Sequence, residues 1–480
     1  MFFIWFGTGF SKEKIQSIDE ESSKGEETME AYLKIKPTNQ SQGWHGFGVS
    51  GAWWAQIIGD CDRAYRDKLL KLLFDPEFGI GIQIYRYNIG AGEPHSIKDP
   101  WRSTETFEVS KGVYDWERDS AAMKVLIEAV ALGVDKVIAF ANSPTARMTI
   151  SGSVDGHRKG KSNLNKEMVD DFCDYLIDVS DFLVSQGVPV KEISPINEPQ
   201  WAWNPSKGQE GCHYTAQEAA VVVEALLDRI DERGKDYQVA AVDSGDWRRS
   251  RKYIDTLFSN QLISERLQAF HLHSYWSDAL DKKRLVDYYD RNNPGMIFVM
   301  SEWTQMDTGR ETTMESALNM ARVIYEDITI GQVTSWQYWI AVSKYDFTDG
   351  LIYVDFDSDA DKTPEMTLTK RLFVLGNYSK FIRSGQVRLN ITGNMSYLKP
   401  VAFYDRQRDW INLVLINDSP YEINTTINAF YETGYFIDQA YLTDETSNLR
   451  QLEHAEWQVQ EKQTKLTIPH KSVITLLLKK

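Results

Sequence analysis

The chain has 480 residues, 42% hydrophobic and 25% charged, a balance typical of a folded globular protein rather than a disordered one. Its 53 basic and 69 acidic residues give a formal net charge of −16, and a surface of this sign repels phosphate backbones, so nucleic acid is not expected as a partner. Three cysteines are too few for a disulfide framework, and their spacing fits no zinc motif.

The first thirty residues do not resemble part of a folded core. Residues 11–30 are polar and highly charged, which predicts an exposed arm over 1–30. The apolar start before them lacks the basic region and the small-residue cleavage site of a signal peptide, which favours a cytoplasmic location over a secreted one. No segment approaches the roughly 18 consecutive apolar residues of a membrane span, so none is expected.

Strand-like and helix-like segments then alternate. Ala31–Lys36 alternates apolar and polar residues like a half-buried strand, and we assign 31–43 to a strand that pairs with the far end of the chain. Eight more strands are predicted, over Gly46–Ser50, Gly81–Asn88, Lys136–Ala141, Glu192–Ile196, Gln238–Asp243, Gln268–His273, Met296–Ser301 and Val333–Trp339. Helical patterns separate them, for example Met168–Gln186 and Thr215–Arg233, the latter with Thr215 and Glu218 in capping-box register and Gly234 past its end.

Eight strands with intervening helices over about 330 residues predict a (β/α)₈ barrel of the α/β class, over 44–375. A doubly wound open sheet is the alternative, but it usually has fewer strands and often a glycine-rich loop after the first. Here the first strand leads into Gly51-Ala52-Trp53-Trp54, which suits a barrel rim better.

After about residue 376 the pattern changes to short β-type runs separated by turn residues, for example 410–416, 425–430, 465–468 and 473–478. We therefore expect an all-β sandwich over 376–480, attached to the barrel and joined by the N-terminal strand.

Two glutamates end strands of the predicted barrel. Glu198 follows the fourth strand and Glu302 the seventh, and catalytic groups of such barrels lie at the carboxyl ends of the strands. These two ends can face each other across the mouth of an eight-strand ring. A carboxylic acid and a carboxylate on either side of one bond are the groups that glycoside hydrolysis needs.

Several motifs together resemble glycoside hydrolase family 30, a family of retaining (β/α)₈ glycosidases with a β-sandwich beside the barrel. Besides Glu302 they are Asn197-Glu198-Pro199, Gly46-Phe47-Gly48 with Trp53-Trp54, Arg86-Tyr87-Asn88-Ile89-Gly90, Ala141-Asn142-Ser143-Pro144 and Met148–Ser153. The resemblance covers residues 31–480. It implies that Glu198 is the general acid/base and Glu302 the nucleophile, that Asn197 binds the sugar 2-hydroxyl, and that Arg86 lies near Glu302 and keeps it ionised. No cofactor is implied.

Further polar residues lie at predicted strand ends. His273 and Tyr275 share one face of the sixth strand and are expected to hydrogen bond to Glu302 or to sugar, while Asn142 and Ser143 could bind hydroxyl groups. His271 lies on the same face as His273, which invites a metal interpretation. No third ligand has a suggestive spacing, so no metal site is predicted.

The fifteen tryptophans could serve the core or stack on sugar rings. Eight of them fall at or just beyond predicted strand ends, where a sugar chain would lie: Trp53, Trp54, Trp201, Trp203, Trp247, Trp276, Trp303 and Trp339. Trp54, Trp201 and Trp339 are the candidates for stacking.

Within the family, Gln209-Glu210-Gly211-Cys212-His213 is most similar to the β-1,6-galactanase branch, so the expected substrate is a β-1,6-linked galactan or oligosaccharide. Two segments depart from that branch, Thr145-Ala146-Arg147 where a Trp is typical and His271–Trp276 where Thr-Tyr-Gly is usual. The alternatives are β-1,6-glucan, xylan, a β-xyloside or a β-fucoside, or a non-catalytic carbohydrate-binding protein. Endo or exo action and oligomeric state are left open.

Overall fold

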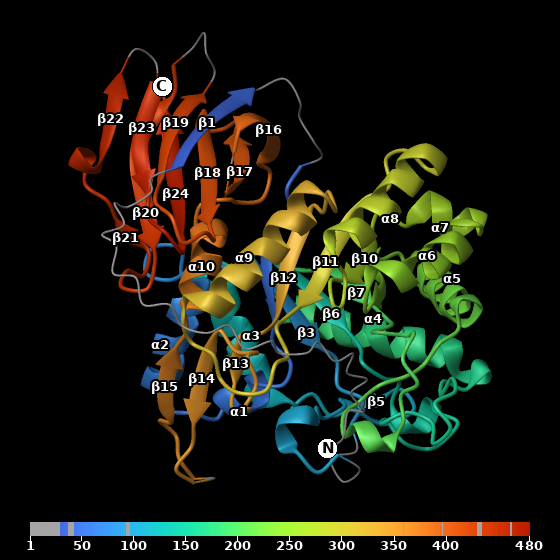
Figure 1. The fold of residues 1–480 in the computed structure, drawn as a ribbon. Coiled ribbons are helices and arrows are strands. Elements are labelled where there is room, and N and C mark those ends of the chain that lie inside the picture. The colour runs from blue at the N-terminus through green and yellow to red at the C-terminus, as the bar shows by residue number, and fades with distance from the viewer. Residues whose placement is uncertain are drawn as a thin grey trace, which may run out of the picture.

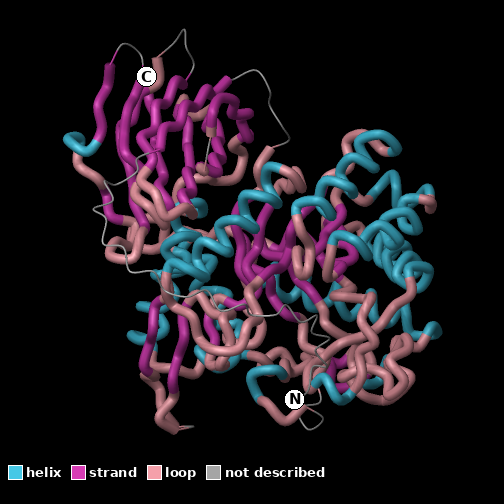
Figure 2. The backbone as a smooth tube through the Cα atoms, viewed as in Figure 1, coloured by secondary structure: helices cyan, strands magenta, loops and turns pink. Residues whose placement is uncertain are grey.

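The computed structural model describes residues 29–36, 43–92, 97–358, 360–395, 397–429, 434–460 and 463–480 (Figure 1). A ring of strands surrounded by helices lies beside a second body made almost wholly of strands (Figure 2). Within these residues, no helix combines the length and apolarity needed to cross a membrane.

The ring is a sheet of nine strands in the order β8-β7-β6-β3-β2-β12-β11-β10-β9, all parallel. Its two end strands, β8 (Gln238–Val239) and β9 (Ala241–Ser244), are separated only by Ala240, so the chain itself closes the ring. The other strands are β2 (Gly46–Ser50), β3 (Ile84–Asn88), β6 (Lys136–Phe140), β7 (Val190–Ser194), β10 (Phe270–His273), β11 (Phe298–Trp303) and β12 (Ser335–Ile340). The predicted barrel is confirmed, with its fifth strand split in two.

Helices cover the outside of the barrel (Figure 1). They are α1 (Ala55–Ile58), α2 (Arg63–Phe74), α3 (Ser120–Leu132), α4 (Val169–Ser185), α5 (Ala216–Glu232), α6 (Trp247–Phe258), α7 (Gln261–Arg266), α8 (Ala279–Asn292) and α9 (Met314–Thr329). The predicted capping box of α5 is present: the Glu218 N–H donates to Thr215 Oγ1 at 3.3 Å, and the Thr215 N–H to Glu218 Oε2 at 2.7 Å.

Short elements in the loops were not predicted, because runs of two to four residues carry no readable periodicity. A hairpin pairs β4 (Glu108–Ser110) with β5 (Val113–Tyr114), and a three-stranded sheet contains β13 (Val342–Ser343), β14 (Ile352–Asp355) and β15 (Glu365–Leu368). The 3₁₀ helices are η1 (Pro100–Arg102), η2 (Ala146–Met148), η3 (Lys166–Met168), η4 (Pro205–Lys207) and η5 (His454–Glu456).

The second body is a ten-stranded sheet in the order β21-β20-β24-β18-β17-β16-β1-β19-β23-β22. Its strands are β1 (Met29–Lys36), β16 (Val387–Asn394), β17 (Leu398–Asp405), β18 (Trp410–Asn417), β19 (Ile423–Ala429), β20 (Phe436–Thr443), β21 (Arg450–Gln451), β22 (Trp457–Gln460), β23 (Gln463–Ile468) and β24 (Ser472–Lys479). Because β20 and β23 contact each other although they lie near opposite ends of this order, the sheet curls round a common core, as the predicted sandwich requires.

Strand β1 pairs antiparallel with β16 and parallel with β19, which confirms the predicted pairing of an N-terminal strand with the C-terminal sheet. The strand begins at Met29, so the last two residues of the predicted arm belong to the sheet. The rest of the arm, residues 1–28, and the stretch 37–42 lie outside the described residues.

Alternate residues of β18 pack into two different cores, that of the curled sheet and that of the barrel. Ile411, Leu413 and Leu415 pack inside the curled sheet, whereas Val414 and Ile416 belong to the core of the barrel. Helices α9 and α10 (Lys370–Ser379) lie between the two bodies and contact the sheet. Burial on both faces explains why this strand is an almost continuous apolar run.

Candidate active site

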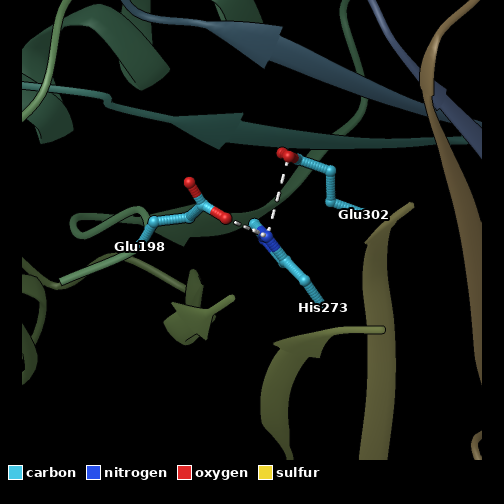
Figure 3. A group of neighbouring side chains, drawn as sticks. All are labelled: Glu198, His273 and Glu302. Atoms are coloured by element: carbon cyan, nitrogen blue, oxygen red, sulfur yellow. Dashed lines mark hydrogen bonds and ion pairs between the residues drawn. The ribbon is translucent and has the colours of Figure 1, made fainter. Parts of the chain in front are cut away.

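Glu198 and Glu302 meet at the carboxyl ends of the barrel strands, on either side of His273 (Figure 3). His273 Nδ1 lies 3.3 Å from Glu198 Oε1 and 3.6 Å from Glu302 Oε1. One carboxylate oxygen from each glutamate and the histidine nitrogen all lie within 4.8 Å of one another. Glu302 is the last residue but one of β11, Glu198 lies four residues past β7, and His273 is the last residue of β10.

Glu302 is held by two further donors. Arg86 Nη1 donates to Glu302 Oε2 at 2.7 Å, and the Tyr275 hydroxyl donates to Glu302 Oε1 at 3.2 Å. The structure thus brings together four of the residues that the sequence predicts for the site, Arg86, His273, Tyr275 and Glu302, around one buried carboxylate.

A third carboxylate, that of Asp243, contacts Arg86 and was not predicted. Arg86 Nη2 lies 3.2 Å from Asp243 Oδ2, so the guanidinium bridges Asp243 and Glu302. The hydroxyls of Ser194 and Ser301 both donate to Asp243 at 2.5 Å. All of these side chains are buried, and the carboxylates supply the negative charge that a buried arginine requires.

The charges of the group shift one another's pKa. Burial raises the pKa of Glu302, against the opposing effect of His273 and Arg86. Burial would lower the pKa of His273, but the charges of Glu302 and Glu198 outweigh it and raise that pKa. Burial would also raise the pKa of Asp243, but Arg86, His271 and His273 hold it below its ordinary value. The charge of His273 and the charge of Glu302 therefore depend on each other.

A chain of asparagine side chains leads away from Arg86. Arg86 Nη2 donates to Asn197 Oδ1 at 3.3 Å, Asn197 Nδ2 to Asn142 Oδ1 at 3.1 Å, and Asn142 Nδ2 to Asn88 Oδ1 at 2.9 Å. Asn197 and Asn142 are thus oriented by fixed partners beside the glutamates. Ser143 turns away, since its hydroxyl donates to the Pro144 carbonyl at 3.0 Å.

Near the far end of this chain lies Glu210, which sequence reasoning placed only in a family motif. The Ala91 N–H donates to Glu210 Oε1 at 3.2 Å, and burial raises the pKa of this carboxyl to about 8 against hydrogen bonds from Ala91, Thr104 and Asn88. Glu210 therefore ties the loop after β7 to the loop after β3.

The backbone is strained at two acidic residues of the site, Glu198 and Asp243. Glu198 has φ 46° and Asp243 φ 49°, in the left-handed region that side chains other than glycine rarely adopt. The Glu198 N–H donates to the Asp243 carbonyl at 2.9 Å, so the two strained positions brace each other. Such strain is typical of residues that a fold holds in place for function.

The structure buries most of the tryptophans that the sequence places at strand ends. Of the eight at predicted strand ends, five are buried: Trp53, Trp54, Trp203, Trp247 and Trp303. Trp54 has no exposed surface, and its Nε1 donates to the Ser50 carbonyl at 2.8 Å, so the prediction that it stacks on sugar is wrong. Trp201 and Trp339 are half-buried, and Trp276, not among the stacking candidates, is 54% exposed.

Glu198, His273 and Glu302 are also the described residues whose ligand atoms could converge on a metal ion. However, Glu302 already carries Arg86 at 2.7 Å, and a cation bound between the glutamates would lie close to that guanidinium. The side-chain set therefore fits an acid, a base and their own positive partners better than a metal centre.

Asp243 was not predicted for the site at all, while Glu210 and Trp276 were named from the sequence without a role of their own. Asp243 lies next to the last residue of β9, the second half of the fifth strand, so the rule that located Glu198 and Glu302 would have found it too. Trp276 follows the sixth strand in the same way, but its exposure depends on the fold.

A (β/α)₈ barrel with two glutamates that converge at the carboxyl ends of its strands contains the groups that a glycoside hydrolase needs. The model of O-glycosyl hydrolase family 30 matches residues 30–271 and 295–353. The chain belongs to this family and is an O-glycosyl hydrolase, as the sequence resemblance predicted.

Several known proteins are similar to this chain over most of its length. An endo-β-1,6-galactanase of Hypocrea rufa is 26% identical over 387 residues, which are 74% of this chain and 75% of that protein. The crystal structure of a conserved exported protein from Bacteroides fragilis has a TM-score of 0.82 and 25% identity, and covers 93% of this chain and 100% of its own. The catalytic domain of the GH30 xylanase C from Talaromyces cellulolyticus shares the fold, with a TM-score of 0.76 at 18% identity, over 94% of this chain and 100% of its own.

Proposed function

We propose that the protein is a retaining β-glycosidase that cleaves β-1,6-linked galactan or galacto-oligosaccharides, with Glu198 as general acid/base and Glu302 as nucleophile. One observation carries the mechanism: carboxylate oxygens of the two glutamates lie within 4.8 Å of each other. Retaining glycosidases hold their carboxyl groups about 5–5.5 Å apart, whereas inverting enzymes need about 6.5–9.5 Å to admit a water molecule.

In the first step Glu198 gives its proton to the glycosidic oxygen while Glu302 attacks the anomeric carbon. The bond to the leaving sugar breaks and an ester bond to Glu302 forms. Water then attacks the same carbon, its proton passes to Glu198, and Glu302 is released as a carboxylate. Arg86 and Tyr275 support this role for Glu302, because both donate to the carboxylate and thereby favour its charged form.

Asn197 is proposed to bind the sugar 2-hydroxyl, and Asn142 to act beside it. Asn197 is adjacent to Glu198 in the chain, and its amide is held between Arg86 and Asn142. A preoriented amide can strengthen its hydrogen bond as charge develops on the sugar in the transition state. Ser143 has the weakest support, since its hydroxyl is engaged with the backbone.

The sugar is inferred from the galactanase of Hypocrea rufa, which matches about three quarters of this chain. The other specificities of the family, on β-1,6-glucan, xylan, β-xylosides or β-fucosides, are the second candidates. A non-catalytic carbohydrate-binding role is disfavoured, because the glutamates converge and Glu302 retains its donors. The expected cytoplasmic location stays a prediction.

The experiment that tests the proposal is a screen of linkage-defined β-linked oligosaccharides, with ¹H NMR of the first product formed. We expect β-1,6-galacto-oligosaccharides to be cleaved fastest and the β anomer to appear before mutarotation, because two displacements restore the original configuration. An α anomer at first would contradict the carboxylate roles. Faster cleavage of glucan or xylan would contradict the sugar alone.

The pH dependence of kcat/KM should be bell-shaped, with an acid limb above the ordinary carboxyl pKa of about 4.3. Burial raises the pKa of Glu302, so its reactive carboxylate is lost as pH falls through that raised value. Because the charge of His273 lowers the pKa of Glu302, we expect His273→Gln to move the acid limb to higher pH. An acid limb that stays in place or moves down in this variant would contradict the proposed coupling.

A further inference from the structure

Two indole rings form a corner beside Glu198. Trp201 lies three residues after Glu198, and Trp276 lies three residues after His273. Their ring centroids are 5.4 Å apart and their planes stand at 85°. Trp276 is 54% exposed, and among the described residues it is the only tryptophan with a largely exposed side chain.

The corner is fixed on both sides. The guanidinium of Arg249 lies 4.8 Å from the ring centroid of Trp201, and the ring of Tyr275, which donates to Glu302, lies 5.4 Å from that of Trp276. The Trp276 carbonyl also accepts a hydrogen bond from Arg248 at 3.1 Å. An exposed ring held by such contacts loses little conformational freedom when a ligand packs on it.

Gly245 shows which catalytic group the corner adjoins. A Cβ atom at this position would overlap Gln200 Nε2 and would lie 2.7 Å from Glu198 Oε1 and 3.3 Å from Trp201 Nε1. The carboxyl oxygen of the proposed acid, the indole N–H of Trp201 and the amide of Gln200 therefore all border Gly245. The corner lies on the side of Glu198.

We propose that Trp201 and Trp276 form the subsite for the leaving sugar, with the exposed ring of Trp276 against a pyranose face. This inference rests on the proposed function. A general acid must lie within hydrogen-bond reach of the oxygen that it protonates, so the sugar attached to that oxygen lies on the side of the acid. The apolar C–H face of a pyranose suits a flat aromatic ring.

The same corner would hold an acceptor sugar after the first step. A sugar hydroxyl in place of water attacks the anomeric carbon, its proton passes to Glu198, and the ester bond to Glu302 breaks as a new glycosidic bond forms. The subsite thus affects how much of the glycosyl-enzyme reacts with water, which is hydrolysis, and how much reacts with a sugar, which is transfer.

Trp276→Ala tests the proposal on two substrates that both present the anomeric carbon of a galactosyl residue to Glu302. β-1,6-Galactotetraose occupies the leaving-group subsite, whereas β-galactosyl fluoride has a leaving group too small to reach it. We expect the ratio of kcat/KM for the tetraose to that for the fluoride to fall about tenfold, equivalent to about 1.4 kcal/mol. With galactose added as acceptor, the ratio of glycosyl transfer to hydrolysis should fall by a similar factor. Trp276→Phe should keep most of the value of both ratios.

Two further variants make the result decisive. Trp276 has φ 49°, so Trp276→Gly removes the ring with a residue suited to that backbone and replaces the alanine variant if the latter fails to fold. Phe78→Ala removes an exposed aromatic side chain, 79% accessible, that precedes β3 at the opposite end of the barrel, and should leave both ratios unchanged.

A ratio of the two kcat/KM values that is unchanged in Trp276→Ala, whether or not both values fall, would overturn the subsite and leave the proposed function intact. A wild-type protein that turns over no β-glycoside would overturn both. If the wild type prefers another β-glycan, the same ratio is measured with the tetrasaccharide and the fluoride of that sugar, and the proposal is judged on it.

Discussion

Replacing Glu302 by glutamine is expected to lower kcat by about 10⁴- to 10⁶-fold, the scale seen when a catalytic nucleophile is removed. The amide cannot form the ester bond to the anomeric carbon. Glutamine keeps the size of the side chain and an oxygen that can accept from Arg86 or Tyr275, so the fold and the oligosaccharide site should persist.

Hydrolysis and binding are measured separately, the first by product release and the second by titration calorimetry with β-1,6-galactotetraose. Glu232→Gln provides the matched control, because that side chain is 61% exposed on α5. Hydrolysis by Glu302→Gln within tenfold of the wild type would rule out Glu302 as nucleophile. Loss of binding together with activity would point to a structural role instead.

The largest effect on stability is expected for Arg86→Met. This change leaves Asp243 and Glu302 buried without their shared counter-charge, and breaking a buried ion pair in this way costs about 3–5 kcal/mol. The midpoint of urea denaturation should fall accordingly. Without Arg86 the folded-state pKa of Glu302 rises further above its unfolded value, so the loss of stability should be smaller at low pH and grow as pH rises through that pKa.

Two comparisons separate this effect from a simple loss of packing. Arg284→Met, at an exposed position of α8, should change the midpoint little. Adding Asp243→Asn to Arg86→Met removes one of the stranded charges and should recover part of the lost stability. A double variant no more stable than Arg86→Met at pH 8 would show that the carboxylates are not the cause.

Much of the fold was open to prediction because the periodic signals were strong. The strand at Gly46–Ser50 was predicted with its observed bounds, and the α5 capping box was predicted from Thr215 and Glu218. Parallel strands buried on both faces produce continuous apolar runs, and the rule that polar groups act at their carboxyl ends then located Glu198 and Glu302.

The misses have a common physical cause, since burial and partner choice depend on contacts distant in sequence. Trp54 follows a strand as a sugar-stacking residue would, yet its indole N–H bonds to Ser50 and the ring lies in the core. The importance of Asp243 depends on Arg86, 157 residues away in the chain. The exposure of Trp276 depends on how the loop after β10 turns at a left-handed residue.

The position of β1 bears on the order in which the protein is completed during synthesis. This strand joins β16 to β19, and its Tyr32 hydroxyl accepts from Asn428, 396 residues further along the chain. A ribosome adding about 5–20 residues per second emits β1 long before either neighbouring strand exists. The barrel segments can assemble in the meantime, while both hydrogen-bonding edges of β1 still lack their partner strands. The nascent chain therefore carries an unpaired strand until its last quarter is made, and chaperones that bind extended apolar segments would have that interval in which to act.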